Sequence, residues 1–182
     1  AWADTLFDAL NNAFWCDRIA AFGGAVVVNR PLDMKCAELI ASQYFEVVAA
    51  PAFEEGVVDV LKGRKNLRIF ELPGLAHLDE LKGIPMLDFK SLTDGGIIMQ
   101  KSFVNRINSV EDFIPATGAK KDGTVFTARK PTEKEAEDLL FAWAVEAGVT
   151  SNSVIFVRDG ATVAIGTGEQ DRVGCAELAI HK

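Results

Sequence analysis

The chain has 182 residues and a mass of 19.7 kDa, which is enough for one domain of ordinary size or for two small ones. Hydrophobic residues make up 49% of the sequence and charged residues 25%, a balance that excludes intrinsic disorder. The net charge of −7 argues against a nucleic-acid-binding surface, which needs clustered lysines and arginines, but it allows a small anionic ligand held by one arginine and a helix N-terminus.

The first part of the chain alternates between helical and extended patterns. Apolar residues that recur every four positions predict an opening helix that buries Trp2, Leu6, Leu10 and Phe14. Asp33 can cap a second helix, with the inner face Ala37, Ile40 and Tyr44. Short apolar runs predict strands at 25–28, 47–50 and 67–72, and a further helix is expected at 54–62. This order predicts an α/β sheet covered by helices.

The middle of the chain is less regular. Strands are expected at 86–89 and 97–100, with the turn sequence Asp94-Gly95-Gly96 between them. The stretch 105–123 is polar and contains one proline and two glycines. We therefore expect a boundary here between two subdomains, residues 1–115 and 116–182.

The last third has the clearest local signals. Thr132 and Glu135 form a capping box that predicts a helix to about Ala147, and Gly148 would end it. The residues expected to be buried on this helix are Leu139, Leu140 and Trp143. Strands at 154–158 and 161–165 would pair across Asp159-Gly160, a two-residue hairpin turn. A closing helix follows.

The segment from Asn152 to Arg172 is the most informative one chemically. Gly166-Thr167-Gly168 precedes the helix that carries Arg172, and such a turn either lets a ligand approach the backbone or only connects a strand to a helix. The side-chain amide of Asn152 can donate and accept at once, which suits a base or a carboxamide, although a cap of the following strand is the commoner use.

Two weaker candidates lie earlier in the chain. Phe22 and Gly23 could form a flat ligand floor, or Phe22 could be a buried ring beside a glycine bulge. Glu46 opens an otherwise apolar strand, where it would either cap the sheet or bind a ligand hydroxyl.

The histidines and cysteines indicate no metal site. His77 and His181 have no partner at metal-ligand spacing, so no zinc is expected. The three cysteines are far apart and odd in number, which disfavours a disulfide framework and fits a reducing cytoplasm. No apolar run approaches the about 20 residues of a membrane span.

An ordered series of short stretches resembles a known family. The stretches are Cys16-Asp17, Ala21-Phe22-Gly23-Gly24, Asn29-Arg30-Pro31, Glu46-Val47-Val48, Lys65-Asn66-Leu67-Arg68, Gly95-Gly96, Pro131-Thr132-Glu133, Leu139-Leu140-Phe141-Ala142-Trp143, Ser151-Asn152-Ser153, Asp159-Gly160, Ile165-Gly166 and Arg172-Val173. They resemble the formyltransferase part of the bifunctional purine biosynthesis protein, the aminoimidazole carboxamide ribonucleotide (AICAR) transformylase. The resemblance covers nearly the whole chain.

The resemblance implies zinc-free, cytidine-deaminase-like α/β/α subdomains and a mixed sheet. It implies that a formyl group passes from formyl-tetrahydrofolate to the amine of the ribonucleotide. The substrate contacts implied by position are Phe22, Gly23, Glu46, Asn152 and Arg172. Asn152 would also be the catalytic amide, and Val173 would contact the folate. No nucleic-acid or membrane partner is implied, and the parent enzyme would be a cytoplasmic homodimer.

The resemblance also has departures. The family's Gly-x-Gly-Ala-Gly-Gln run is replaced by Gly166-Thr167-Gly168-Glu169-Gln170-Asp171. The family's catalytic Lys-His pair would lie upstream of Trp2, and its second half would lie downstream of Lys182. We therefore expect an internal fragment that is inactive on its own, made of the remainder of one subdomain and the start of a second. The alternatives are a non-catalytic nucleotide-binding or regulatory module and an inactive folding fragment.

Overall fold

Three parallel strands and three helices form the first unit of the fold. The computed structural model describes residues 1–182. The strands are β1 (Gly24–Val27), β2 (Phe45–Ala50) and β3 (Arg68–Glu71), hydrogen-bonded in the order β1-β2-β3. The helices are α1 (Leu6–Cys16), α2 (Met34–Ser42) and α3 (Val57–Lys62). The predicted α/β class is confirmed, and the side chain of Asp33 caps α2 by accepting a hydrogen bond from the Cys36 N–H.

A core of 13 buried residues lies on one face of this sheet. Alternate residues of the strands point into it, and Val48, Ile40, Val57 and Leu61 are almost completely buried there. On the opposite face Val27 is 61% exposed and Phe70 is 47% exposed. Helices therefore cover only one face of the sheet, whereas the resemblance implied α/β/α layers.

A hairpin between two helices forms the second unit. Strands β8 (Ser153–Arg158) and β9 (Ala161–Thr167) are antiparallel and pack against α4 (Glu133–Glu146) and α5 (Arg172–His181). The predicted turn at Asp159-Gly160 is confirmed, since both residues have positive φ angles, 54° and 70°, as a two-residue hairpin turn requires.

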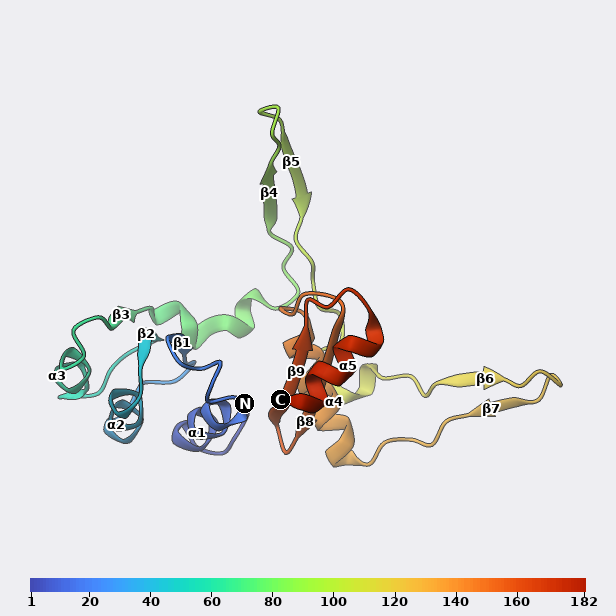
Figure 1. Ribbon diagram of the computed structural model, residues 1–182, viewed down its shortest axis with the longest axis horizontal. Helices are drawn as coiled ribbons and strands as arrows, with labels where there is room; N and C mark the ends of the chain where they lie inside the picture. The colour runs from blue at the N-terminus through green and yellow to red at the C-terminus, as the bar shows by residue number, and fades with distance from the viewer.

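Helix α1 connects the two units. Leu10 and Phe14 belong to the core of the first unit, while the sulfur of Cys16 lies 2.9 Å from the Thr162 hydroxyl on β9. Near the other end of α1, the Trp2 N–H donates to the Gly160 carbonyl at 2.6 Å. These contacts hold the two units side by side (Figure 1).

Two hairpins project from this body in different directions, as Figure 1 shows. Strands β4 (Leu87–Ser91) and β5 (Ile97–Lys101) form the first, and β6 (Thr117–Ala119) and β7 (Val125–Thr127) form the second. The first was expected from the sequence and the second was not. The remaining elements are the short 3-10 helices η1 (Pro73–Leu81) and η2 (Val110–Asp112).

Four side chains are not buried as their spacing predicted. Trp2 and Tyr44 lie outside the helices, and they are 51% and 42% exposed. On α4 the buried residue is Phe141, at 5% exposure, whereas Leu139 and Trp143 are 51% and 43% exposed. Spacing identified an apolar stripe on α4, but the contacts with the hairpin decide which part of that stripe is covered.

Candidate functional site

The first group of predicted site residues lies where β1 and β2 begin. The ring of Phe22 stacks on Tyr44 with ring centroids 4.8 Å apart and is 73% exposed, so it is not a buried ring. The N–H of Gly23 donates to the Tyr44 carbonyl at 2.9 Å, and its φ of +73° favours glycine. The pair thus presents an open aromatic face beside a turn.

Glu46 lies next to this turn and faces the guanidinium of Arg68, a partner that the sequence analysis did not predict. Its Oε2 is 3.8 Å from Nη1 of Arg68, and both side chains are about half exposed. The parallel register aligns Val47 with Arg68, which brings the two side chains together at the start of their strands. An exposed pair at this distance contributes little to stability, so both groups remain available to a polar ligand.

Asn152 is held by the turn that precedes α5. Its Nδ2 donates to the Glu169 carbonyl at 3.0 Å, and its backbone N–H donates to the same oxygen at 3.3 Å. The thiol of Cys175 in turn donates to the Asn152 carbonyl at 3.2 Å. The amide of Asn152 is thus tied to the turn before α5, while its Oδ1 accepts no hydrogen bond from the protein.

Arg172 is the first residue of α5, and its side chain is exposed without an ion-pair partner. The N–H groups beside it are not free for a ligand. The carboxylate of Asp171 accepts hydrogen bonds from the Val173 and Gly174 N–H groups at 2.9 and 2.8 Å. An anion at this helix N-terminus would have to displace or tolerate Asp171, whereas Arg172 itself remains accessible.

The two glycines before α5 have structural roles, one in packing and one in the turn. Gly166 is buried against α5, and Gly168 has a φ of +71° in the turn. These observations favour the strand-to-helix connection among the two readings of this turn. Val173, the implied folate contact, is 69% exposed.

The structure places the two groups of residues on different units and shows no direct contact between them. No hydrogen bond or ion pair connects Phe22, Gly23 or Glu46 with Asn152 or Arg172. Five hollows of the surface, with volumes of about 270 to 960 Å³, are lined by other residues. One group lies on the three-stranded sheet and the other on the hairpin unit.

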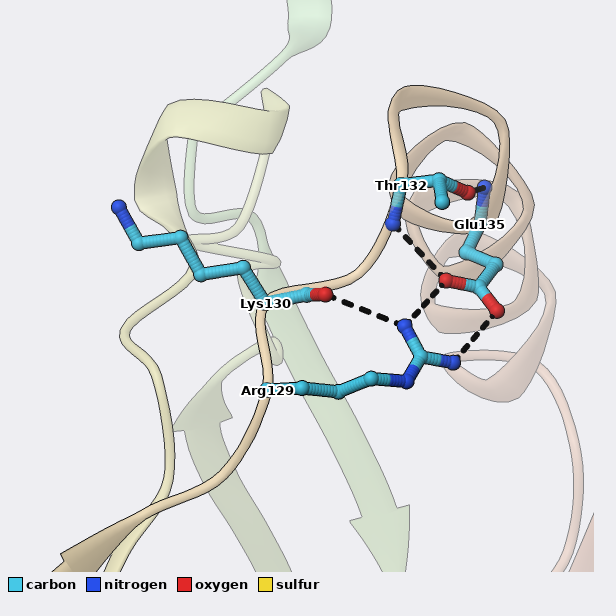
Figure 2. Close-up of polar contacts among 4 residues, drawn as sticks. All are labelled: Arg129, Lys130, Thr132 and Glu135. Atoms are coloured by element: carbon cyan, nitrogen blue, oxygen red, sulfur yellow. Dashed lines mark hydrogen bonds and ion pairs between the residues drawn. The ribbon is translucent and has the colours of Figure 1, made fainter.

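A network of charged and polar groups lies at the start of α4, and Figure 2 shows it. The guanidinium of Arg129 donates two hydrogen bonds to the Glu135 carboxylate, at 2.8 and 2.7 Å, and one to the Lys130 carbonyl at 3.1 Å. The predicted capping box is confirmed, with the Thr132 N–H donating to Glu135 at 2.8 Å. Arg129 and then the Thr132 N–H lower the pKa of Glu135 to about 2.

This network borders a hollow of about 720 Å³, but the charges of Arg129 and Glu135 are already paired with each other. Arg129 is occupied by Glu135, so the hollow has no free cation from this pair for an anionic ligand. Sequence reasoning identified the Thr132-Glu135 box but not Arg129, because Arg129 lies outside the helix, six residues before Glu135.

Metal-binding groups are absent. No three histidine, cysteine, aspartate or glutamate side chains lie together in a way that could hold a metal ion. The cysteines are free thiols, and burial together with the nearby Asp33 carboxylate raises the pKa of Cys36 to about 12. None of the helices has both the length and the apolar character needed to cross a membrane.

Comparison with known proteins gives a match over the entire chain. The sequence model of the AICARFT/IMPCHase bienzyme family matches residues 1–182. The bifunctional purine biosynthesis protein PurH of Roseobacter denitrificans is 37% identical over 182 residues, which are 100% of this chain and 31% of the relative. PurH of Cereibacter sphaeroides is 38% identical over 178 residues, and PurH of Thermoanaerobacter sp. is 37% identical over 183 residues. The chain thus spans about a third of the length of these curated relatives.

Proposed function

The chain belongs to the AICARFT/IMPCHase bienzyme family, and from that membership we propose that it is part of a formyltransferase of purine biosynthesis. The proposed reaction moves a formyl group from formyl-tetrahydrofolate to the amine of aminoimidazole carboxamide ribonucleotide. Formyl-tetrahydrofolate is the co-substrate, and the proposal involves no metal. The observation that supports it is the family match over all 182 residues.

In this proposal the group on the three-stranded sheet binds the sugar and base. The open ring face of Phe22 would lie against the flat base, with Gly23 allowing close approach. The carboxylate of Glu46 would accept hydrogen bonds from the ribose hydroxyls, with Arg68 beside it. These are binding roles, and none of them moves a proton.

The group on the hairpin unit would act on the anionic and reacting parts. Arg172 is exposed and unpaired, which suits a contact with a negative charge of the substrate. Asn152 would orient the carboxamide with its free Oδ1 and polarise the formyl oxygen with its second amide hydrogen. Val173 would contact the folate. Positioning two reactants in this way lowers the barrier by several kcal/mol.

Because the two groups lie on different units, the proposed site needs further protein to bring them into one cavity. We propose that residues 1–115 and 116–182 belong to two cytidine-deaminase-like subdomains, and that the enzyme is a cytoplasmic homodimer. Neither nucleic acid nor a membrane takes part in this proposal.

The experiment compares two variants of the protein expressed at the full length that its gene encodes. Arg172→Ala is expected to weaken ribonucleotide binding roughly ten- to a hundredfold, the usual cost of about 1.5–3 kcal/mol for a charge-assisted contact, with folate binding changed less. Asn152→Ala is expected to lower the rate of formyl transfer more than the affinity. Calorimetry and single-turnover kinetics separate the two effects.

Arg158→Ala is the matched control, because Arg158 is an exposed arginine at the opposite end of β8. It should leave binding and rate unchanged. The proposal is wrong if the unchanged protein transfers no formyl group, or if Arg172→Ala binds the ribonucleotide as tightly as Arg158→Ala.

A further inference from the structure

The hairpin of β4 and β5 has one apolar and one polar face, and the apolar face is open to solvent. Leu87, Phe89, Ile97 and Met99 point to the same side of the ribbon and are between 59% and 69% exposed. Asp88, Lys90 and Gln100 point to the other side. Neither strand packs substantially against another helix or strand, and the ribbon stands away from the body (Figure 1).

A ribbon of this kind needs a partner. An isolated two-stranded hairpin is marginally stable in water, and three or more strands with an apolar face are needed for independent stability. An open strand edge also offers unpaired N–H and C=O groups to another chain. Both properties point to a further strand added at the edge of the ribbon.

The hydrogen-bond pattern shows which groups of β4 are free. At one end the Ser102 N–H donates to the Met86 carbonyl at 2.8 Å, and at the other the Leu92 N–H donates to the Gly96 carbonyl at 2.8 Å. Bonded positions alternate in an antiparallel pair, so Asp88 and Lys90 bond to β5. The N–H and C=O groups of Leu87, Phe89 and Ser91 therefore point outward.

We propose that β4 pairs edge to edge with β4 of a second copy of this chain, antiparallel and centred on Phe89. This deepens the proposed function by giving its homodimer a contact surface. Phe89 meets Phe89 of the other copy as a hydrogen-bonded pair, because its backbone groups point outward. Asp88 then lies opposite Lys90 of the other copy, twice in the dimer. The two ribbons become one four-stranded sheet.

Charge complementarity selects this arrangement over its neighbours. Opposite charges directly across a strand pair stabilise it, and like charges destabilise it. Centring the pair on Asp88 or on Lys90 would place identical charges opposite each other. Pairing through the other edge, centred on Met99, would place Ile98 opposite Gln100 with no charge pair at all. Of these four arrangements, the one centred on Phe89 is the one that places opposite charges across the strand pair and also uses the outward backbone groups.

A charge-swap series tests this pairing by sedimentation of the protein at the full length that its gene encodes. Asp88→Lys or Lys90→Asp alone turns both attractive pairs into repulsive ones, and we expect each to raise the dimer dissociation constant by roughly tenfold or more. The double swap restores attraction with the signs exchanged, so it should return the constant to near that of the unchanged protein. Lys121→Asp, at the tip of the other hairpin, is the control and should have no effect.

Hydrogen exchange supplies a second readout that does not depend on the variants. The outward N–H groups of Leu87 and Phe89 should be protected in the dimer and should exchange freely on dilution to the monomer. A protein that stays monomeric overturns both this pairing and the proposed dimer. If the single reversals do not change the dimer dissociation constant, or the double swap does not restore it, the pairing is wrong but the proposed dimer still stands. A sedimentation mass that rises beyond that of a dimer as the protein concentration increases would also contradict the pairing, because a two-fold contact closes at two copies.

Discussion

Among the glycines, Gly166 is the one whose change to alanine we expect to destabilise the protein most, because it packs directly against α5. The residue is buried in β9, and a Cβ atom there would come closer than 3.0 Å to the Cys175 carbonyl oxygen. The same atom would lie 3.1 Å from the Ala179 nitrogen and 3.2 Å from its Cβ. All of these atoms belong to α5, and the nearest ones are backbone atoms that cannot rotate away. The helix itself must therefore move.

The cost of this movement can be estimated from overpacked cores, where an extra methyl group typically costs about 1–3 kcal/mol. Because the contact is with backbone, we expect Gly166→Ala to lie near the upper end, at about 3 kcal/mol. Moving α5 would also disturb the hydrogen bond from the Cys175 thiol to the Asn152 carbonyl. The substitution should thus loosen the corner that carries Arg172.

Urea unfolding followed by tryptophan fluorescence measures the loss, and hydrogen exchange in α5 locates it. Gly74→Ala is the matched control, since a Cβ there meets nothing within 4 Å. It should change the free energy of unfolding by less than about 0.5 kcal/mol. If Gly166→Ala unfolds at the same urea concentration as Gly74→Ala, with equal protection of α5, the close approach of helix and strand is wrong.

Two further predictions concern the first core and the start of α4. Leu61 is fully buried, so Leu61→Ala should lower the free energy of unfolding by about 2–5 kcal/mol in a urea titration, and an unchanged midpoint would contradict the core described above. Glu135 should titrate near 2 by NMR, and Arg129→Gln should move its pKa toward the ordinary value of about 4.3. Because the folded state lowers this pKa, the stabilisation is present above the ordinary value and is lost as the pH falls toward 2. A Glu135 pKa unaffected by Arg129→Gln would refute the ion pair.

The sequence predicts best what depends on neighbouring residues. The Asp33 cap, the Thr132-Glu135 box and the Asp159-Gly160 turn all follow from local hydrogen bonding and backbone preference, and all are present. Burial is predicted less well, because it depends on what packs against a segment. Tyr44 continues the apolar spacing of α2 but lies beyond its end, where it stacks on Phe22 instead.

The candidate site shows the same division. Residue types and their order in the chain identified Glu46 and Arg172, and position in the family gave each a role. The partner of Glu46 could not be read from the chain, because Arg68 reaches it only through the register of two parallel strands. The sequence analysis likewise did not predict that Asp171 caps α5 and accepts hydrogen bonds from its first N–H groups, although aspartate is a favoured N-cap residue.

The exposure of the predicted binding groups sets a condition on the proposed function. Glu46 and Arg172 lie in solvent, where a contact with a charged ligand is screened and contributes little. The same contact is much stronger when protein covers it and excludes water. Tight binding of an anionic nucleotide therefore requires that another surface close over these residues. A second copy bound through the β4 and β5 ribbon would supply additional protein surface. The proposed function and the proposed pairing therefore make a joint prediction. Conditions that dissociate the dimer should weaken nucleotide binding before they unfold either unit.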